Sequence, residues 1–269
     1  ELETKAWIES GTIGASVTHV DASGAVAVTA MSTIDPLVPD LPEPLKGKVD
    51  WLTLNSVAIA GGASSGGAAV TGGFILDIIS TSTKAWIGAG AQVNQDGAMG
   101  GAGQSVTVRA ADDVHIVNVA GALALSQSSA GVGLTVIVEI VNSDVRSWIA
   151  DAASVRAGGV ITVDADGTED WFVLSVAGAA SANSAAVTGS VLVLVSGQGS
   201  SNPETESKIG AADVQGAGGI QVTAHRTMTA ALSAGNLAIG GGSAGVRASA
   251  LGGVRDSVVE AYAANGAVL

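Results

Sequence analysis

Short runs of alternating apolar and polar residues recur along the chain, each a little after a glycine. They read AVAVTA at 25–30, SVTVRA at 105–110, VITVDA at 160–165 and IQVTA at 220–224. Period-two alternation in runs rich in Val and Thr is typical of a strand with one buried face. The pattern therefore predicts four equivalent strands.

Four longer stretches contain no Asp, Glu, Lys or Arg. They cover residues 51–76, 114–138, 171–203 and 227–246. Their length suits a membrane-spanning helix, but Gly, Ser, Asn or Thr interrupts the middle of each, and the flanking halves are β-branched. We therefore expect two apolar strands joined by a small-residue turn in each stretch, and a chain that does not span a membrane.

A third motif carries a large aromatic residue. The sequence TKAWI stands at both 4–8 and 83–87, VRSWI follows at 145–149, and degenerate copies lie at 205–209 and 259–263. No segment shows a sustained helical period with helix caps. Each repeat unit is thus expected to hold a Trp-motif strand, a V-T-V strand and two apolar strands.

The apolar stretches begin at equivalent positions that give the period of the repeat. These positions are Val57, Val119, Val176 and Ser233, which lie 62, 57 and 57 residues apart. A fixed period of this size indicates a repeat architecture. We predict an all-β fold, a parallel β-solenoid or β-helix of about four repeats of roughly 57 residues. Stacked coils are expected to cover the apolar strands on both faces. A β-sandwich-like repeat array is the alternative, although it does not explain the period.

We interpret residues 1–269 as a single repeat array that is a fragment of a longer protein. Within the first repeat, residues 34–50 hold four of the five prolines: Pro36, Pro39, Pro42 and Pro44. Such a run does not fit a central strand, so we predict a projecting Pro-rich loop. The loop is either a tolerated surface insertion or a contact surface.

If each repeat forms one coil of the solenoid, the Trp motifs of successive coils lie one above another and form a stripe. Alternation places Lys5 and Trp7 on one face, and the lysine requires that face to be solvent. We therefore expect an outer aromatic stripe of Trp7, Trp86 and Trp148, continued by Tyr262 beyond Lys208. The stripe is a candidate contact surface, with cover of the coil junctions as the simpler interpretation. The neighbouring outer column is expected to contain Lys5, Lys84, Arg146, Glu206 and Glu260.

The composition fits close packing of small side chains. The chain has 38 glycines, 3% aromatic residues, no cysteine and a net charge of −13. Nucleic-acid binding is disfavoured because it needs Lys/Arg patches against phosphates. Disulfides and thiolate sites are excluded. Together with the repeat, the lack of cysteine favours an extracellular location.

The motifs of catalysis are missing from the sequence. His19, His115 and His225 do not share a repeat position, and no P-loop or nucleophile elbow occurs. We therefore expect that the protein is not an enzyme and needs no cofactor. The exception is the acidic run at 164–170, interpreted as a loop. Its Asp164, Asp166, Glu169 and Asp170 are candidate ligands of a weak Ca²⁺ site, with a solvated turn as the simpler interpretation.

The motifs at 83–87, 105–110, 119–124 and 130–133 resemble repeats of large bacterial filamentous adhesins of the leukotoxin LktA-like family. The resemblance implies a secreted, elongated β-solenoid at the bacterial cell surface that acts in attachment or matrix, without catalytic residues. The degenerate motif at 205–209 and the Pro-rich insertion depart from the family pattern.

The predicted function is that of a structural or adhesive segment of an extracellular bacterial surface filament. Its expected partners are further copies or neighbouring repeats of the same protein, with surface glycans or matrix as other candidates. A carbohydrate-binding or carbohydrate-active β-helix is the alternative. It requires a cluster of Asp or Glu with Arg or Lys on one face.

Overall fold

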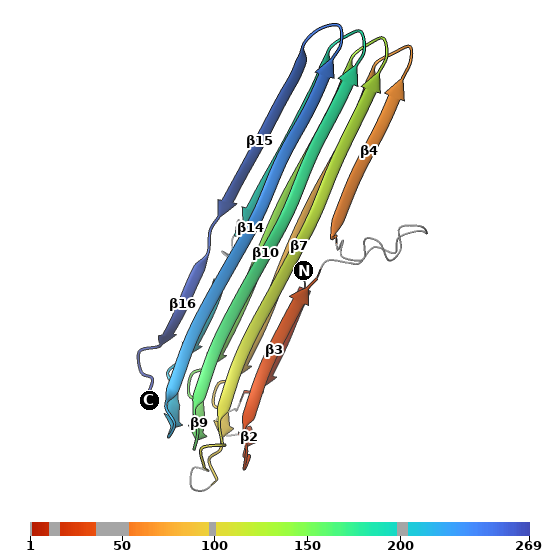
Figure 1. The fold of residues 1–269 in the computed structure, drawn as a ribbon. Coiled ribbons are helices and arrows are strands. Elements are labelled where there is room, and N and C mark those ends of the chain that lie inside the picture. The colour runs from red at the N-terminus through yellow and green to blue at the C-terminus, as the bar shows by residue number, and fades with distance from the viewer. Residues whose placement is uncertain (1, 11–16, 36–53, 97–100, 198–203) are drawn as a thin grey trace, which may run out of the picture.

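The computed structural model describes residues 2–10, 17–35, 54–96, 101–197 and 204–269, which contain 16 β-strands (Figure 1). In these ranges no residue is helical, so no apolar helix there could cross a bilayer. All strand pairs are parallel. The prediction of an all-β fold with parallel strands is confirmed.

The strands form three sheets. Two are named here by the direction of their arrows in Figure 1, and the third by its place at the lower end of the molecule. The ascending sheet contains β3 (Val26–Ile34), β4 (Ser56–Ser64), β7 (Val106–Ser126), β10 (Ile161–Ser181) and β14 (Ile220–Gly240). The descending sheet contains β1 (Leu2–Ile8), β5 (Ala69–Ile87), β8 (Gly131–Ile149), β11 (Ala186–Ser196), β12 (Glu204–Ile209), β15 (Gly245–Arg255) and β16 (Val258–Ala263). The basal sheet contains the short strands β2 (His19–Val20), β6 (Gln92–Val93), β9 (Ser154–Ala157) and β13 (Asp213–Gly216).

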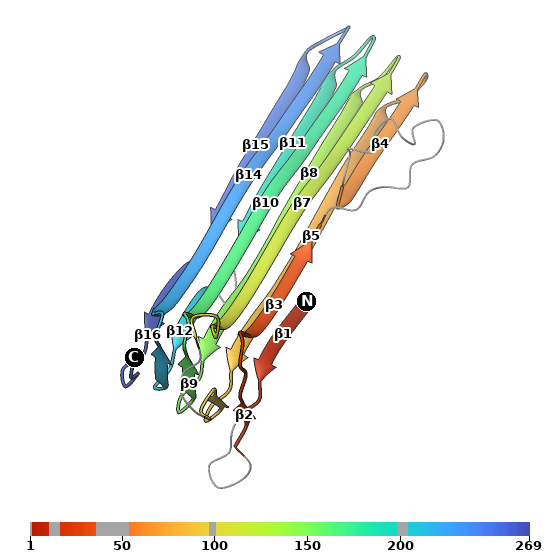
Figure 2. The same cartoon turned by 60° about the horizontal axis from the view of Figure 1, so that its bottom comes forward.

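The chain passes through the three sheets in a fixed order. It ascends, turns at the end that we call the tip, descends, and crosses the basal sheet before ascending again (Figure 2). Val106 pairs with Ile161 and Ile161 pairs with Ile220, so successive passes are offset by 55 and 59 residues. These offsets agree with the predicted period of roughly 57 residues.

The long strands differ from the four-strand unit predicted from the sequence. The V-T-V run and the first apolar half form one strand of 21 residues, β7, and the second apolar half continues into the Trp motif as β8, of 19 residues. The strands run through their charged positions because alternation sends Arg109 and Asp113 outward, while the inward Asp112 accepts hydrogen bonds from Thr81 and Ser143, both at 2.6 Å. The basal strands were not predicted.

The insertion in the first repeat interrupts one ascending strand. Ile34 of β3 pairs with Val114, and Ser56 of β4 pairs with Asn118, so both strands lie against β7. Between these two pairs the first repeat contains residues 35–55, whereas β7 contains only 115–117. Ile34, the first residue of the predicted Pro-rich loop at 34–50, belongs to β3. Pro36, Pro39, Pro42 and Pro44 lie outside the described residues.

The small-residue turns at the tip are tied to one another by serines. The Ser126 hydroxyl accepts a hydrogen bond from the Ser129 amide at 3.2 Å and donates to the Gly67 carbonyl of the preceding coil at 2.9 Å. Ser181 repeats this arrangement with Ser184 and Ser129. Each serine thus closes its own turn and links it to the neighbouring coil, which confirms the turns predicted within the uncharged stretches.

The core changes character from base to tip. At the base, Ile87, Ile149, Val155 and Ile161 are fully buried between all three sheets. At the tip only alanines form the buried cluster: Ala69, Ala124, Ala179 and Ala186.

Glycines show why the tip interior holds only small residues. A Cβ on Gly131 would lie 2.8 Å from the Ala180 carbonyl oxygen of the opposite sheet, and a Cβ on Gly133 would clash with the Gly178 carbonyl. The two backbones therefore approach more closely than the usual spacing of about 10 Å between packed sheets. The molecule narrows toward the tip.

Candidate interaction surface

The predicted aromatic stripe exists as a ladder on the descending sheet. Trp7 pairs with Trp86 and Trp86 with Trp148, and their ring centroids are 5.3 and 4.9 Å apart. The rings are parallel within 9° and 3°, because identical residues in paired parallel strands lie one above another. Ala85 and Ile87 on either side of Trp86 are fully buried, so the tryptophans point outward as predicted.

The ladder limits what the tryptophans can bind. A sugar ring stacks on the open face of an aromatic ring, but in this ladder the faces of Trp86 lie against its two neighbours. Trp7, at the end of the ladder, is 51% exposed. Beyond Trp148 the register continues through Lys208 to Tyr262, as predicted. The arrangement favours cohesion between coils over glycan stacking.

The charged column beside the ladder has the expected register. Lys5 pairs with Lys84, Lys84 with Arg146, and Glu206 lies between Arg146 and Glu260. Its repulsion is offset by acidic residues two positions away. Asp144 contacts both Lys84 at 3.3 Å and Arg146 at 2.6 Å.

Glu206 differs from the expected solvent exposure of this column. It is only 5% exposed, and its carboxylate accepts a hydrogen bond from the Tyr262 hydroxyl at 2.6 Å. Lys208 lies 3.4 Å from the same oxygen. These two side chains partly cover the carboxylate.

A mixed-charge patch lies on the outer face of the ascending sheet near its middle. Arg109 contacts Asp164 at 3.3 Å and Asp166 at 3.6 Å. His115 lies between Asp113 at 3.1 Å and Asp170 at 3.3 Å. This is the kind of cluster that the carbohydrate-active alternative requires. Its carboxylates outnumber its cations, so it does not suit an acidic polysaccharide.

The candidate Ca²⁺ ligands do not lie in a loop. Asp164, Asp166, Glu169 and Asp170 all belong to β10, in the middle of the sheet. Alternation sends Glu169 inward, where it pairs with Arg226, while the three aspartates point outward. The four carboxylates therefore do not converge. Among the described residues, no three His, Asp or Glu side chains form a group suited to a metal ion.

Large apolar side chains cover the outside of the tip. On the ascending sheet, every second residue of 57–63, 117–125, 172–180 and 231–239 points outward, and we call this surface the ascending tip face. Large apolar residues alternate there with Gly and Ala. Ser233 is the single polar residue among these positions. On the descending sheet the equivalent residues of 70–78, 132–140, 187–195 and 246–254 are all apolar and form the descending tip face.

The tip faces correct the expectation that stacking covers both sides of the apolar strands. Ile59 is 76% exposed and Ile78 is 66% exposed. Stacking buries the inward positions and leaves these outward positions in water. Exposed apolar patches of several hundred Å² mark interaction sites more often than chance.

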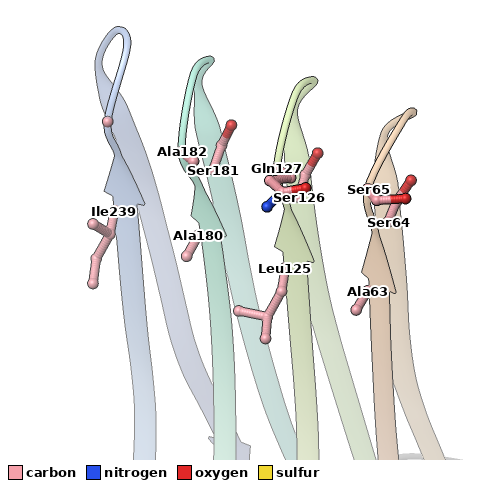
Figure 3. Close-up of a pocket in the computed structure, with 11 residues that line it drawn as sticks. Ala63, Ser64, Ser65, Leu125, Ser126, Gln127, Ala180, Ser181, Ala182 and Ile239 are labelled. Carbon is pink, nitrogen blue, oxygen red and sulfur yellow. The ribbon is translucent and has the colours of Figure 1, made fainter.

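A groove runs across the ascending tip face just below the turns. Its volume is about 800 Å³. Figure 3 shows Leu125 and Ile239 on the two strands that flank Ala180, so a small side chain lies between two large ones. The groove is lined along its upper side by Ser126 and Ser181.

A buried polar cluster lies between the two long sheets at mid-height. The Asn118 amide donates to Asp77 at 2.7 Å and to Glu139 at 2.6 Å. Asp77 also accepts a hydrogen bond from Ser56 at 2.9 Å. Asp77 and Glu139 are paired positions of adjacent strands, so two carboxyl groups share one amide donor.

Burial is the main reason that the pKa of Glu139 is raised to about 7, and the charge of Asp77 raises it further. The hydrogen bond from Asn118 acts in the opposite direction. Glu139 is therefore protonated over much of the acidic range in the folded protein.

Sequence reasoning missed the tip faces and this polar cluster. Strand parity could have revealed both. Glu139 stands two residues from Ile137 and two from Val141, so it shares their inward face, whereas Val138 and Ile140 share the outward face. Applied to each uncharged stretch, the same rule separates an outer, mostly apolar set from an inner set that becomes small toward the turn.

The chain matches no protein-family model, and comparisons with curated proteins and with solved structures find no significant match.

Proposed function

We propose that this protein is a structural or adhesive segment of an extracellular bacterial surface filament, built as a β-solenoid. The observation that carries the proposal is the register between coils. Val28, Val108, Val163 and Val222 occupy one continuous line of paired positions across four coils. Repeats that contact only their neighbours form elongated rather than compact molecules.

The surface chemistry supports a structural role. The tryptophans stack on one another, the tip serines bond from coil to coil, and Asp144 links two adjacent cations. Most of the distinctive side chains are therefore used to hold one coil to the next. The resemblance to filamentous adhesin repeats and the net charge of −13 are consistent with this role.

The outermost strands provide the means of elongation in this proposal. Among the strands that the structure describes, β1 at one end of the descending sheet pairs only with β5, and β15 at the other end pairs only with β11. Open parallel edges present free backbone donors and acceptors to a further strand. Neighbouring repeats of the same protein, or a second copy, fit these edges best because they continue the same ladder.

Immunogold electron microscopy of intact source cells tests the proposal. Antibodies against this chain are expected to label thin filaments outside the cell envelope. Label confined to the cell interior would overturn the proposal. Small-angle scattering of the purified chain supplies the second measurement. Four coils stack to roughly 20 Å while strands of 21 residues extend about 70 Å, so the longest dimension of this chain should follow the strands.

The mixed-charge patch of Arg109, His115 and the four aspartates gives the carbohydrate alternative its support. A glycan array probed with the chain and with an Asp170→Asn variant would decide it. Binding that the variant loses would favour a carbohydrate-binding β-helix.

A further inference from the structure

The geometry points to the ascending tip face as the docking site for a second copy of this chain, packed face to face. This inference rests on the proposed structural role, and it names the partner of one surface. The occupant follows from the shape of the face, from its area and from the polar turns above it.

The row of side chains nearest the tip alternates in size from coil to coil. It runs Ala63, Leu125, Ala180, Ile239 across four paired strands. Leu125 and Ile239 are 42% and 55% exposed. With strands about 4.8 Å apart, the two large side chains stand roughly 10 Å apart with a furrow between them.

Small and large residues also alternate in the next two rows. The second row runs Gly61, Leu123, Gly178, Leu237, again small and large in alternation. The third reverses the order as Ile59, Gly121, Val176, Gly235.

A second copy of the same face carries ridges at the spacing of these furrows. Turned by half a turn about an axis parallel to the strands, the second copy presents its coils in reverse order. Its Leu123 and Leu125 then enter the furrows over Gly178 and Ala180. The reversed third row also fixes the position along the strands, because a slip of one row places large side chains on large ones. Identical facing sheets with interdigitated side chains are the geometry of dry sheet interfaces.

The area is sufficient for a weak but specific dimer. Four strands at about 4.8 Å and nine residues at about 3.3 Å give a face of roughly 600 Å². Two such faces bury about 1,200 Å², the lower limit of specific protein interfaces. The patch carries no charged side chain, so pairing leaves no ion unsolvated.

The turns above the face argue against a lipid bilayer as the occupant. The tip ends in hydrogen-bonded serines, Ser64, Ser126 and Ser181, with Gln127 beside them. Insertion from the tip would carry these polar turns through the hydrocarbon region, which is costly. Sheet-to-sheet packing leaves them in water.

Sedimentation velocity of the full chain tests the proposal. The wild type is expected to form a species of twice 26.0 kDa at micromolar concentration. The double variant Leu125→Lys, Ile239→Lys should remain a monomer. The matched variant Phe74→Lys, Ile78→Lys on the descending tip face should still dimerise. All four positions point outward, so circular dichroism spectra are expected to stay unchanged.

Ala180→Leu separates shape complementarity from apolarity. It makes the face more apolar but fills the furrow between Leu125 and Ile239, so it should weaken the dimer about tenfold or more. A monomeric wild type, or dimerisation that Ala180→Leu leaves intact, would overturn the inference.

Co-flotation with vesicles of phosphatidylcholine and phosphatidylglycerol supplies the remaining test. Wild-type flotation that Leu125→Lys, Ile239→Lys abolishes and Ala180→Leu preserves would assign the face to lipid and overturn the inference. If the wild type sediments as a monomer while antibodies still label filaments on the cell surface, the docking site is refuted and the proposed function stands. Label only inside cells would refute the function.

Discussion

The base and the tip of this molecule use the same backbone pairing with opposite side-chain arrangements. At the base, Ile87 and Ile149 are buried while Lys84 and Arg146 face outward. Beside the turns at the tip, the buried cluster consists of alanines while Leu125 and Ile239 face outward. Between base and tip, Ile137 and Leu192 are also buried. The parallel ladder therefore does not depend on which face carries the large apolar residues.

The difference shows what each half contributes. Burial of large side chains stabilises the base in proportion to the apolar area removed from water. The tip interior buries little side-chain area, so its stability comes from backbone pairing, close approach of the sheets and the serine links. Its apolar surface remains available for an intermolecular contact.

The largest expected effect separates the two halves directly. Ile149→Ala removes a fully buried side chain at the base and should lower the free energy of unfolding by about 4 kcal/mol. Ile78→Ala, at a tip position that is 66% exposed, should cost less than about 0.5 kcal/mol. Urea denaturation measures both. Equal losses would show that the descending tip face is buried in solution.

Glu139→Gln tests the polar cluster at the boundary between the halves. The raised pKa means that the folded state binds more protons than the unfolded state between about pH 4.5 and 7. The contribution of Glu139 to the free energy of unfolding of the wild type should therefore fall as the pH rises through that window, and it should stay level above it.

The variant removes this dependence, because glutamine keeps the hydrogen-bond acceptor for Asn118 without the buried charge beside Asp77. At pH 8 it should be more stable than the wild type by about 3 kcal/mol. Asp113→Asn, at an exposed carboxylate, is the control and should not remove the dependence. Parallel pH profiles for wild type and Glu139→Gln would contradict the account.

Gly133→Ala probes the close approach of the sheets at the tip. The added methyl group would clash with the Gly178 carbonyl, so the free energy of unfolding should fall by about 2 kcal/mol. Gly121→Ala lies on the outer face, where the nearest side-chain atom is 3.8 Å away, and should be nearly neutral. Thermal unfolding compares the pair. Similar melting temperatures for both variants would mean that the tip can widen freely.

Trp86→Leu should have the smallest effect, about 1 kcal/mol, because it removes stacking on two neighbours and keeps an apolar side chain. Trp7→Leu removes stacking on one neighbour and should cost about half as much. Chemical denaturation followed by near-ultraviolet circular dichroism detects the loss of the coupled indoles. Equal costs at the two positions would show that the ladder adds no stability beyond burial.

The sequence was sufficient for the period and for the lateral register of the coils. Identical side chains at 7, 86 and 148 align because parallel in-register pairing repeats the sequence in space, and the serine-rich turns are local signals. The order Trp148, Lys208, Tyr262 was also correct, although the motif had degenerated there.

Other features depended on contacts that periodicity does not encode. The strands continue through Asp112 because hydroxyls from two descending strands donate to its Oδ2. The acidic run at 164–170 looks like a loop until Arg109 and Arg226 supply its partners from neighbouring coils. The basal strands are two to four residues long, too short to produce an alternation pattern.

The interrupted ascending strand separates the length of the array from what it displays. β3 and β4 are both held by β7, so the chain leaves after Ile34 and returns at Ser56 without disturbing the coils above it. The strands on both sides of the inserted segment are fixed by their pairing with β7. Evolution or protein engineering can therefore replace the inserted segment by another sequence while the stacked coils remain unchanged.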